Sequence, residues 1–331
     1  MKIFVYEHFT GGGMMGHPLP TPLAHEGDAM LRALLDDLTQ CDDAKISASR
    51  DSRLGPLGSG VETLRAREAE TTLDLFRRGV DGADATWPIA PETAGVLENL
   101  TCLVEASGKT LLGSDSSAVR IAASKRMTAQ ALSRSGILVV PTYGAGEAPA
   151  DLPGAWVVKP DDGAGCIRTR IVPDRRAAMA WLSGHLTENT VAQPWLDGEP
   201  FSLSVLAAGG TVRILAVNRQ HIVIDAGCVQ FEGVTVNAVQ DQDGRLLHLA
   251  TRIASAIPGL RGYFGIDYVC GAGGPVVMEI NPRLTSSYCG LRRALGINPA
   301  QLILQSVAHR SEPVAGAEAL GWYPLPFLAS I

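Results

Sequence analysis

The chain has 331 residues, 46% of them hydrophobic, so it is long enough to bury a large core and to divide into two or three domains. Its net charge of −6 and the absence of any basic run argue against nucleic acid as a partner. No apolar run approaches the ~18 residues that a membrane span needs, and no signal-peptide pattern precedes the first strand. We therefore expect a cytoplasmic protein with no membrane partner.

The six cysteines are scattered along the chain, and no two of them form a C-x-x-C pair. This pattern predicts reduced thiols rather than a structural zinc site or a disulfide framework. Cys166 lies in a glycine-rich loop, where we interpret it as a small filler residue rather than a nucleophile. The others are Cys41, Cys102, Cys228, Cys270 and Cys289.

Residues 1–113 alternate between short apolar strands and amphipathic helices. The strands are predicted at 2–9, 44–49 and 83–89, and the helices at 25–38, 61–78 and 91–108. This alternation is typical of a parallel sheet with helices on its faces. We therefore expect an N-terminal α/β domain over 1–113.

From residue 114 the pattern becomes mixed, and later it becomes rich in strands. The mixed segment, 114–192, is predicted to hold helices at 117–135 and 177–186 and strands at 155–159, 166–172 and 191–193. The strand-rich segment, 193–331, is predicted to hold strands at 201–207, 211–220, 226–230, 234–238, 265–269 and 276–281 and a helix at 246–255. Its tail, 321–331, is expected to pack on the surface. The succession indicates an α+β region behind the α/β domain.

Two of the late strands carry the polar groups of a candidate metal site. Asp267 lies in the first, and Glu279 and Asn281 lie two positions apart in the second, so their side chains point to the same face of a strand. Such oxygen ligands hold Mg²⁺ against phosphates. We call these three residues the metal-ligand set. Arg283 extends the row and suits a phosphate-bearing substrate. The residues alone leave open a strand with an ordinary surface carboxylate.

Two lysines precede these strands. Lys159 ends an apolar strand before a loop with Gly163 and Gly165, whose backbone N–H groups can approach anionic oxygens closely. This arrangement favours a polyphosphate site, although a simple hairpin turn would have the same sequence features. Lys125 begins a helix, a position that is uninformative on its own.

The segment Gln193-Pro194-Trp195-Leu196 leaves a strand and enters a turn. An adenine ring needs an acceptor for its amino group and a donor for N1. The carbonyl of Pro194 and the N–H of Leu196 can supply them, since proline lacks only the N–H. Glu199 is placed to accept hydrogen bonds from ribose hydroxyls. The segment therefore predicts a nucleotide-binding hinge.

In this linear order the two lysines, the glycine loop, the hinge and the metal-ligand set resemble the ATP-grasp ligase superfamily over residues 90–295. The resemblance implies an ATP-grasp fold in three parts. These are a pre-ATP-grasp parallel-sheet domain over 1–113, a lid subdomain over 114–192 and a C-terminal antiparallel-sheet subdomain with the metal site over 193–331.

The same resemblance implies an enzyme that joins a carboxylate to an amine through an acyl phosphate and releases ADP and phosphate. Lys125 and Lys159 would contact the phosphates of ATP, and the metal-ligand set would hold one or two Mg²⁺ or Mn²⁺ ions. Arg283 would be catalytic, together with Lys159, by stabilising the transferred phosphoryl group.

Shorter segments resemble the branch of the superfamily that contains tyramine–glutamate ligases and ligases of pyrrolysine formation. They are residues 6–13, 86–99, 218–221 and 279–288. This resemblance implies that the γ-carboxylate of glutamate is joined to tyramine or tyrosine, as in the formation of a methanofuran-type cofactor. Pro194, where the hinge more often carries Glu or Lys, and the compact glycine loop depart from the pattern. Another ATP-grasp amino-acid or peptide ligase is the alternative.

The candidates for substrate contacts are Gly11, Gly12, Gly13, Arg219, Ser286 and Ser287. Backbone N–H groups of the three glycines can bind a carboxylate, and an arginine on a strand can pair with another. A tight turn and a surface ion pair are the respective alternatives. The two serines follow from the branch resemblance.

Residues 11–16 also satisfy G-x-G-x-x-G after a strand, which motivates a rival hypothesis, an NAD-dependent oxidoreductase. That fingerprint needs a helix to begin at the glycines, but Pro18, Pro20 and Pro22 follow and prevent it. A third hypothesis is a non-catalytic nucleotide-binding protein, against which the presence of both lysines and the whole metal-ligand set argues. We expect ATP, an amino acid and an amine as small-molecule partners, and we leave a homodimer open.

Overall fold

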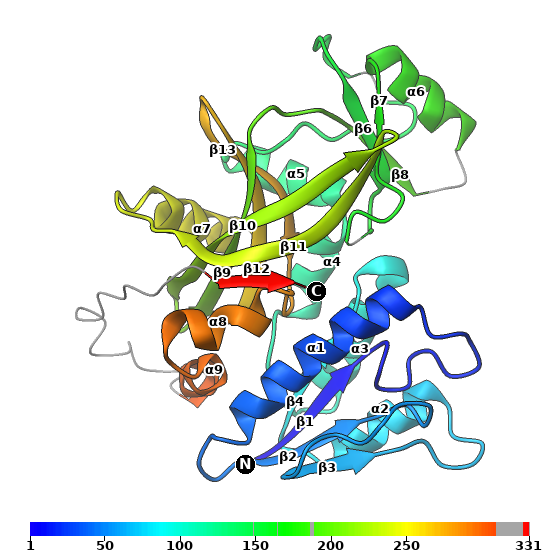
Figure 1. Cartoon of the computed structure of the whole chain (residues 1–331), viewed down its shortest axis with the longest axis vertical. Coiled ribbons are helices and arrows are strands. Elements are labelled where there is room, and N and C mark those ends of the chain that lie inside the picture. Colours follow the sequence, from blue (N-terminus) through cyan, green and yellow to red (C-terminus); the bar gives the residue numbers. More distant parts are fainter. Residues whose placement is uncertain (148, 164, 186–188, 309–326, 331) are drawn as a thin grey trace.

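The computed structural model describes residues 1–147, 149–163, 165–185, 189–308 and 327–330. Two sheets organise them: a five-stranded parallel sheet at the N-terminus and a nine-stranded sheet whose pairs are antiparallel. Figure 1 shows the parallel sheet and its helices at one end of the molecule and the strands of residues 156–194 at the other. No helix within these ranges is long and apolar enough to span a membrane.

The parallel sheet has the strand order β3-β2-β1-β4-β5. In chain order, the strands of this sheet and the helices between them are β1 (Lys2–Glu7), α1 (Thr21–Leu38), β2 (Lys45–Ser49), β3 (Val61–Leu64), α2 (Thr72–Asp81), β4 (Ala85–Ile89), the short 3₁₀ turn η1 (Thr93–Gly95), α3 (Val96–Ala106) and β5 (Thr110–Leu111). The central strand β1 is buried on both faces: Ile3 and Val5 pack with α1, whereas Phe4 and Tyr6 pack with α2 and α3. The predicted parallel α/β architecture is confirmed.

The helix predicted at 61–78 is wrong. Its first residues form β3, which pairs with β2, and α2 begins only after Thr71. The Thr71 side chain accepts a hydrogen bond from Asp74 N, and the Asp74 side chain accepts one from Thr71 N. This capping box sets the true start of the helix. The β-branched residues Val61 and Thr63 favour the edge strand that precedes it.

The middle of the chain contains α4 (Ser116–Ala123), α5 (Lys125–Arg134), β6 (Trp156–Pro160), β7 (Arg170–Val172), α6 (Arg175–Gly184) and β8 (Thr190–Pro194). The single helix predicted at 117–135 is wrong, because Ser124 is extended, with φ −102° and ψ 117°, and divides it. The Ser124 side chain accepts from Met127 N and so caps α5. Of the strand predicted at 166–172, only residues 170–172 form a strand, β7.

The C-terminal part contains β9 (Glu199–Ala208), β10 (Thr211–Asp225), β11 (Cys228–Val239), α7 (Arg245–Ala256), β12 (Gly262–Gly271), β13 (Gly274–Asn281), α8 (Tyr288–Leu295), α9 (Pro299–Ala308) and β14 (Phe327–Ser330). The two strands predicted at 226–230 and 234–238 form the single strand β11, with a shift in register opposite His221 and Ile222. Of the predicted tail, only β14 is described, and it pairs with β11; 321–326 and 331 lie outside the described residues. The domain limits at 113/114 and 192/193 stay predictions.

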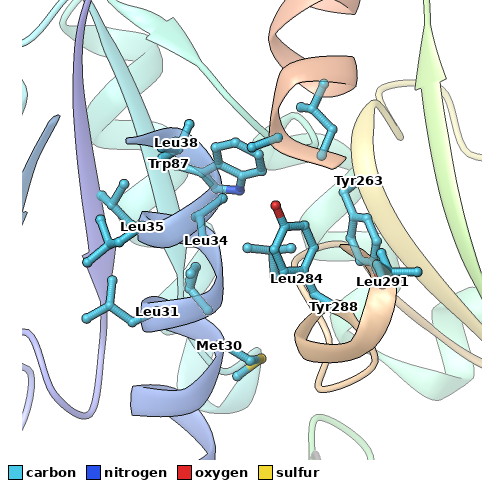
Figure 2. Packing of buried hydrophobic residues seen from close by; sticks show 14 of the residues in the cluster. Met30, Leu31, Leu34, Leu35, Leu38, Trp87, Tyr263, Leu284, Tyr288 and Leu291 are labelled. Carbon is cyan, nitrogen blue, oxygen red and sulfur yellow. The ribbon is translucent and has the colours of Figure 1, made fainter. Parts of the chain in front are cut away.

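A shared core joins the two sheets. Figure 2 shows the leucines of α1 on one side and Leu284, Tyr288 and Leu291 of the C-terminal part on the other. Within this core the Tyr288 hydroxyl donates to Asp37 Oδ2 at 2.9 Å. The parallel sheet is therefore held against the segment that follows β13, and this segment carries Arg283, Ser286 and Ser287 of the candidate site.

Candidate active site

The metal-ligand set comes together where β12 and β13 pair. Asp267 lies opposite Glu279 in the register, and Asn281 Nδ2 donates to Asp267 Oδ2 at 3.3 Å. All three side chains line one cavity of about 110 Å³, which we call the polar cavity. Nowhere in the described ranges do three or more His, Cys, Asp and Glu residues form a metal-binding group. A cation here would therefore rely on two carboxylates, one amide and ligands from outside the protein.

The electrostatics of the two carboxylates suit a cation. Burial and the charge of Glu279 raise the pKa of Asp267 above its usual range. Burial also acts to raise the pKa of Glu279, but the charges of Lys125 and Lys159 outweigh it and hold that pKa below its usual range. A divalent cation would offset the repulsion between the carboxylates. Mg²⁺ is commonly held by one or two carboxylates plus substrate phosphates, so the donor set fits it.

Both predicted lysines, Lys125 and Lys159, lie near Glu279 of the metal-ligand set. Lys125 Nζ lies 3.3 Å from Glu279 Oε2 and donates to the Gly163 carbonyl at 2.6 Å. Burial lowers the pKa of Lys159, whereas the charge of Glu279 acts to raise it. Lys125, Lys159 and Glu279 line a second cavity of about 160 Å³, which we call the hinge cavity. Cationic groups beside carboxylates are what a complex of a divalent cation and a polyphosphate requires.

Asp161 positions Lys125, and the sequence interpretation missed it. Its carboxylate accepts from Ser124 Oγ at 2.6 Å and from Arg126 N at 2.9 Å, and its carbonyl accepts from Lys125 N at 3.1 Å. These bonds hold the break between α4 and α5 against the loop after β6. The partners are more than 30 positions apart, so no local pattern in the sequence indicates the contact.

The hinge segment lines the hinge cavity through Gln193, Pro194, Trp195 and Leu196. Gln193 Nε2 donates to a threonine hydroxyl, while its buried Oε1 has no partner within the described structure, so it is a further acceptor at this place. Glu199 does not line the cavity.

Glu199 instead forms an ion pair with Arg219 at 3.1 Å. The guanidinium of Arg219 also lies 5.2 Å from the ring centre of Phe201. Both residues were predicted to contact ligands, and neither lines the hinge cavity or the polar cavity. Their ligand roles stay predictions.

Arg283 also lines the polar cavity, and a residue that the sequence interpretation did not single out holds it there. Its Nε and Nη2 donate to Glu92 Oε1 and Oε2 at 2.9 and 3.1 Å. This bidentate pair fixes the plane of the guanidinium. Ser286 and Ser287 line the polar cavity beside it, as does Gly165.

A third cavity of about 530 Å³ lies between the parallel sheet and the loop that contains Gly163 and Gly165. We call it the apolar slot, because its walls are mostly apolar side chains from β4, α1 and the turns around them. Arg283 and Gly165 line it as well as the polar cavity. Gly163 lines both the slot and the hinge cavity. The slot, the polar cavity and the hinge cavity therefore adjoin one another.

The loop of Gly11, Gly12 and Gly13 lies elsewhere. A Cβ atom at Gly11 would lie 2.3 Å from the Glu7 carbonyl, and Gly12 has φ +105°, so the loop is a tight turn packed on its own domain. None of the three glycines lines the slot, the polar cavity or the hinge cavity, and their substrate role stays a prediction. α1 begins at Thr21, so the helix that the dinucleotide fingerprint requires does not start at these glycines.

All six cysteines are unpaired. Cys166 lines the hinge and polar cavities, but burial, aided by the charge of Glu279, raises the pKa of its thiol to about 11. The thiol is protonated at neutral pH and is a poor nucleophile. The chemistry of the site therefore depends on its cationic and oxygen-bearing groups.

The chain is similar to known proteins in sequence and in fold. The family model of the ATP-grasp domain matches residues 122–287, which is half of the chain, and that of the pre ATP-grasp 3 domain matches residues 44–119. The chain is 28% identical over 232 residues to the tyramine–L-glutamate ligase of Methanocaldococcus jannaschii, covering 70% of this chain and 66% of that one. It is 26% identical over 276 residues to the ligase of the same name from Methanocaldococcus fervens, covering 82% and 84%.

Among solved structures, a putative ATP-grasp superfamily protein from Archaeoglobus fulgidus superposes with a TM-score of 0.70 at 24% identity, covering 100% of this chain and 99% of that one. This likeness shows the fold. Because the ATP-grasp family model matches half of the chain, the chain belongs to the ATP-grasp family of ligase enzymes.

Proposed function

We propose that the protein is an ATP-dependent carboxylate–amine ligase that forms an amide through an acyl phosphate. The observation that carries this proposal is the junction of the hinge cavity and the polar cavity, which share Asp267 and Glu279. The two lysines line the hinge cavity on one side of the junction, and Arg283 lines the polar cavity on the other side. A phosphoryl group at this junction would meet cationic groups on both sides.

In the proposed complex, the adenine lies against the hinge segment, where the carbonyl of Pro194, the N–H of Leu196 and Gln193 Oε1 offer hydrogen bonds. The phosphates lie between Lys125 and Lys159, near the glycine loop, in a setting of low dielectric that strengthens these contacts. A Mg²⁺ ion held by the metal-ligand set would neutralise phosphate charge and orient the phosphoryl group. Residues 114–192 would act as the lid over the nucleotide.

The chemistry needs no nucleophilic side chain. A substrate carboxylate oxygen attacks the γ-phosphorus, ADP leaves, and the amine then displaces phosphate from the acyl phosphate. Arg283, fixed by Glu92, lies where it would stabilise the charge on the transferred phosphoryl group. Catalysis is then mostly positioning and electrostatic stabilisation.

The names of the two curated relatives motivate the proposed substrates. We propose that the γ-carboxylate of glutamate is activated and that tyramine or tyrosine is the amine, as in the formation of a methanofuran-type cofactor. Another pair of amino-acid and amine substrates would use the same groups, so the proposal of a ligase is separable from the proposal of these substrates.

The test is ADP release with Mg·ATP and glutamate, with and without tyramine or tyrosine, followed by mass spectrometry of the product. ADP release that needs both substrates, with a product equal to their sum less one water, is the expected result. ATP binding with no turnover for any pair of carboxylate and amine would refute the ligase and favour a nucleotide-binding protein. Absence of ATP binding would refute the nucleotide site itself and reopen the NAD hypothesis.

A further inference from the structure

The apolar slot has the position and size of a small-molecule site of its own. It lies at the carboxyl ends of β1 and β4, where Glu7 and Ile89 line it. The order β3-β2-β1-β4-β5 makes this pair the point at which the strand order reverses, and such a switch point is where open parallel sheets bind ligands. A volume of about 530 Å³ is within the range of small-molecule pockets. Its apolar walls include Phe9, Leu23, Met30, Ile89, Val96 and Ile167.

Among the described residues, three carboxylates line the slot, and two of them already have hydrogen-bond donors. Glu7 accepts from Thr10 N at 2.7 Å and from Thr10 Oγ1 at 2.6 Å. Asp162 Oδ2 accepts from Ala94 N at 2.9 Å. No hydrogen bond or ion pair joins the Glu26 side chain to any described residue, so its carboxylate is available to a ligand.

Glu26 also lies at the end of the slot that adjoins the polar cavity. It is on the second turn of α1, on the same face as Leu23 and Met30, and it lines the polar cavity as well as the slot. Arg283 is the other charged side chain that lines both cavities within the described structure. Burial raises the pKa of Glu26, and the charge of Arg283 opposes this. A group bound in the slot would therefore meet Glu26 where the slot adjoins the polar cavity.

We propose that the slot receives the apolar or aromatic body of the amine substrate and that Glu26 is the base that removes a proton from its ammonium group. This inference rests on the proposed function. Primary alkylammonium groups, such as that of lysine with its pKa of about 10.4, are almost fully protonated at neutral pH. The polar cavity, with its serines and Arg283, would hold the activated carboxylate substrate.

Glu26 takes one proton from the ammonium group, and the freed nitrogen lone pair attacks the carbonyl carbon of the acyl phosphate. The C–N bond forms, the C–O bond to phosphate breaks, and phosphate leaves with that electron pair. The nitrogen loses a second proton, which leaves on the phosphate. Atoms and charges balance without any further reactant.

The first test compares Glu26→Gln with Asp36→Asn, which removes an exposed carboxylate from the same helix. With glutamate and tyramine, Glu26→Gln should lower kcat/KM for the amine by about 10²–10⁴-fold, the usual contribution of a general base. With hydroxylamine in place of tyramine, it should still form the glutamyl hydroxamate at close to the wild-type rate. Hydroxylamine is largely unprotonated at neutral pH and needs no base. Asp36→Asn should retain both reactions.

The outcomes separate the two proposals. Amide formation near the wild-type rate in Glu26→Gln would overturn the role of Glu26, and so would equal loss of amide and hydroxamate. If the wild-type protein forms no hydroxamate with glutamate or another amino acid, the acyl phosphate itself is wrong, and the proposed function fails with the inference. Because Glu26 has no hydrogen-bond or ion-pair partner among the described residues, Glu26→Gln should unfold at the wild-type temperature or above it.

A second test addresses the body of the amine. Leu23→Ala removes apolar surface from the slot and should raise KM for tyramine by about tenfold, as expected for lost methylene contacts in a pocket. KM for ethylamine, which lacks the ring, should change much less. Equal effects on both amines, or no effect on either, would overturn the placement of the amine body in the slot.

Discussion

Replacement of Asp161 tests how the break between α4 and α5 positions Lys125. The carboxylate is buried, with 6% exposure, and accepts from Ser124 Oγ and Arg126 N at 2.6 and 2.9 Å. Hydrogen bonds to a charged group contribute about 1.5–3 kcal/mol each, so Asp161→Ala should lower the free energy of unfolding by about 3–6 kcal/mol. That is a large part of the ~5–15 kcal/mol total of a typical domain.

Asp161→Asn is the matched control. Its Oδ1 can still accept from Arg126 N, and the Ser124 hydroxyl can rotate to accept from the new amide, so the expected loss is about 1 kcal/mol. Chemical denaturation measures the free energies, and calorimetric titration measures ATP affinity. The Ala variant should bind ATP about 10–100-fold more weakly, which is the range found when a residue that orients a metal ligand is lost. Wild-type unfolding and ATP affinity in Asp161→Ala would refute the reasoning.

Three further predictions concern other residues. Glu279→Gln removes a charge from the metal-ligand set and from the partner of Lys125, and should lower turnover by about 100-fold or more; turnover near wild type would rule out the metal role. Lys159→Ala should weaken ATP binding in calorimetric titrations, and an unchanged affinity would count against its place over the phosphates. Burial raises the pKa of Glu7 from 4.5 to about 7, against its bonds from Thr10, so the native state holds a proton that the unfolded state has released. The free energy of unfolding should therefore fall as pH rises from about 4.5 to about 7, and Glu7→Gln should remove that part of the slope in denaturant titrations; an unchanged slope would contradict the raised pKa.

Much of the candidate site was predictable because it is written in short stretches of sequence. Glu279 and Asn281 share a face because side chains alternate along a strand, and a lysine at a strand end before glycines favours an anion site. The parallel order of the first sheet likewise follows from alternating strands and helices. These features depend on a few neighbouring residues, so no tertiary information is needed to find them.

The two wrong helix predictions, at 61–78 and 117–135, also have a physical reason. Arginines and glutamates at helical spacing over 61–78 are compatible with a helix, but pairing with β2 and the capping box at Thr71 favour a strand and a later helix. The apparent single helix over 117–135 divides at Ser124, because the Ser124 hydroxyl donates a hydrogen bond to Asp161 in the loop after β6. In both places a contact distant in sequence or a cap outweighs periodicity.

By itself, the sequence determined the parallel α/β beginning, the place of the metal-ligand set on two late strands and the resemblance to the ATP-grasp family. Only the tertiary structure decided that Glu92 holds Arg283, at a separation of 191 residues, and that Glu26 of α1 lies beside the polar cavity. A carboxylate on an amphipathic helix has the same local pattern whether it faces solvent or a cavity. Which of the two it faces depends on how α1 packs against α8 and the strands behind it, and that packing depends on the whole chain.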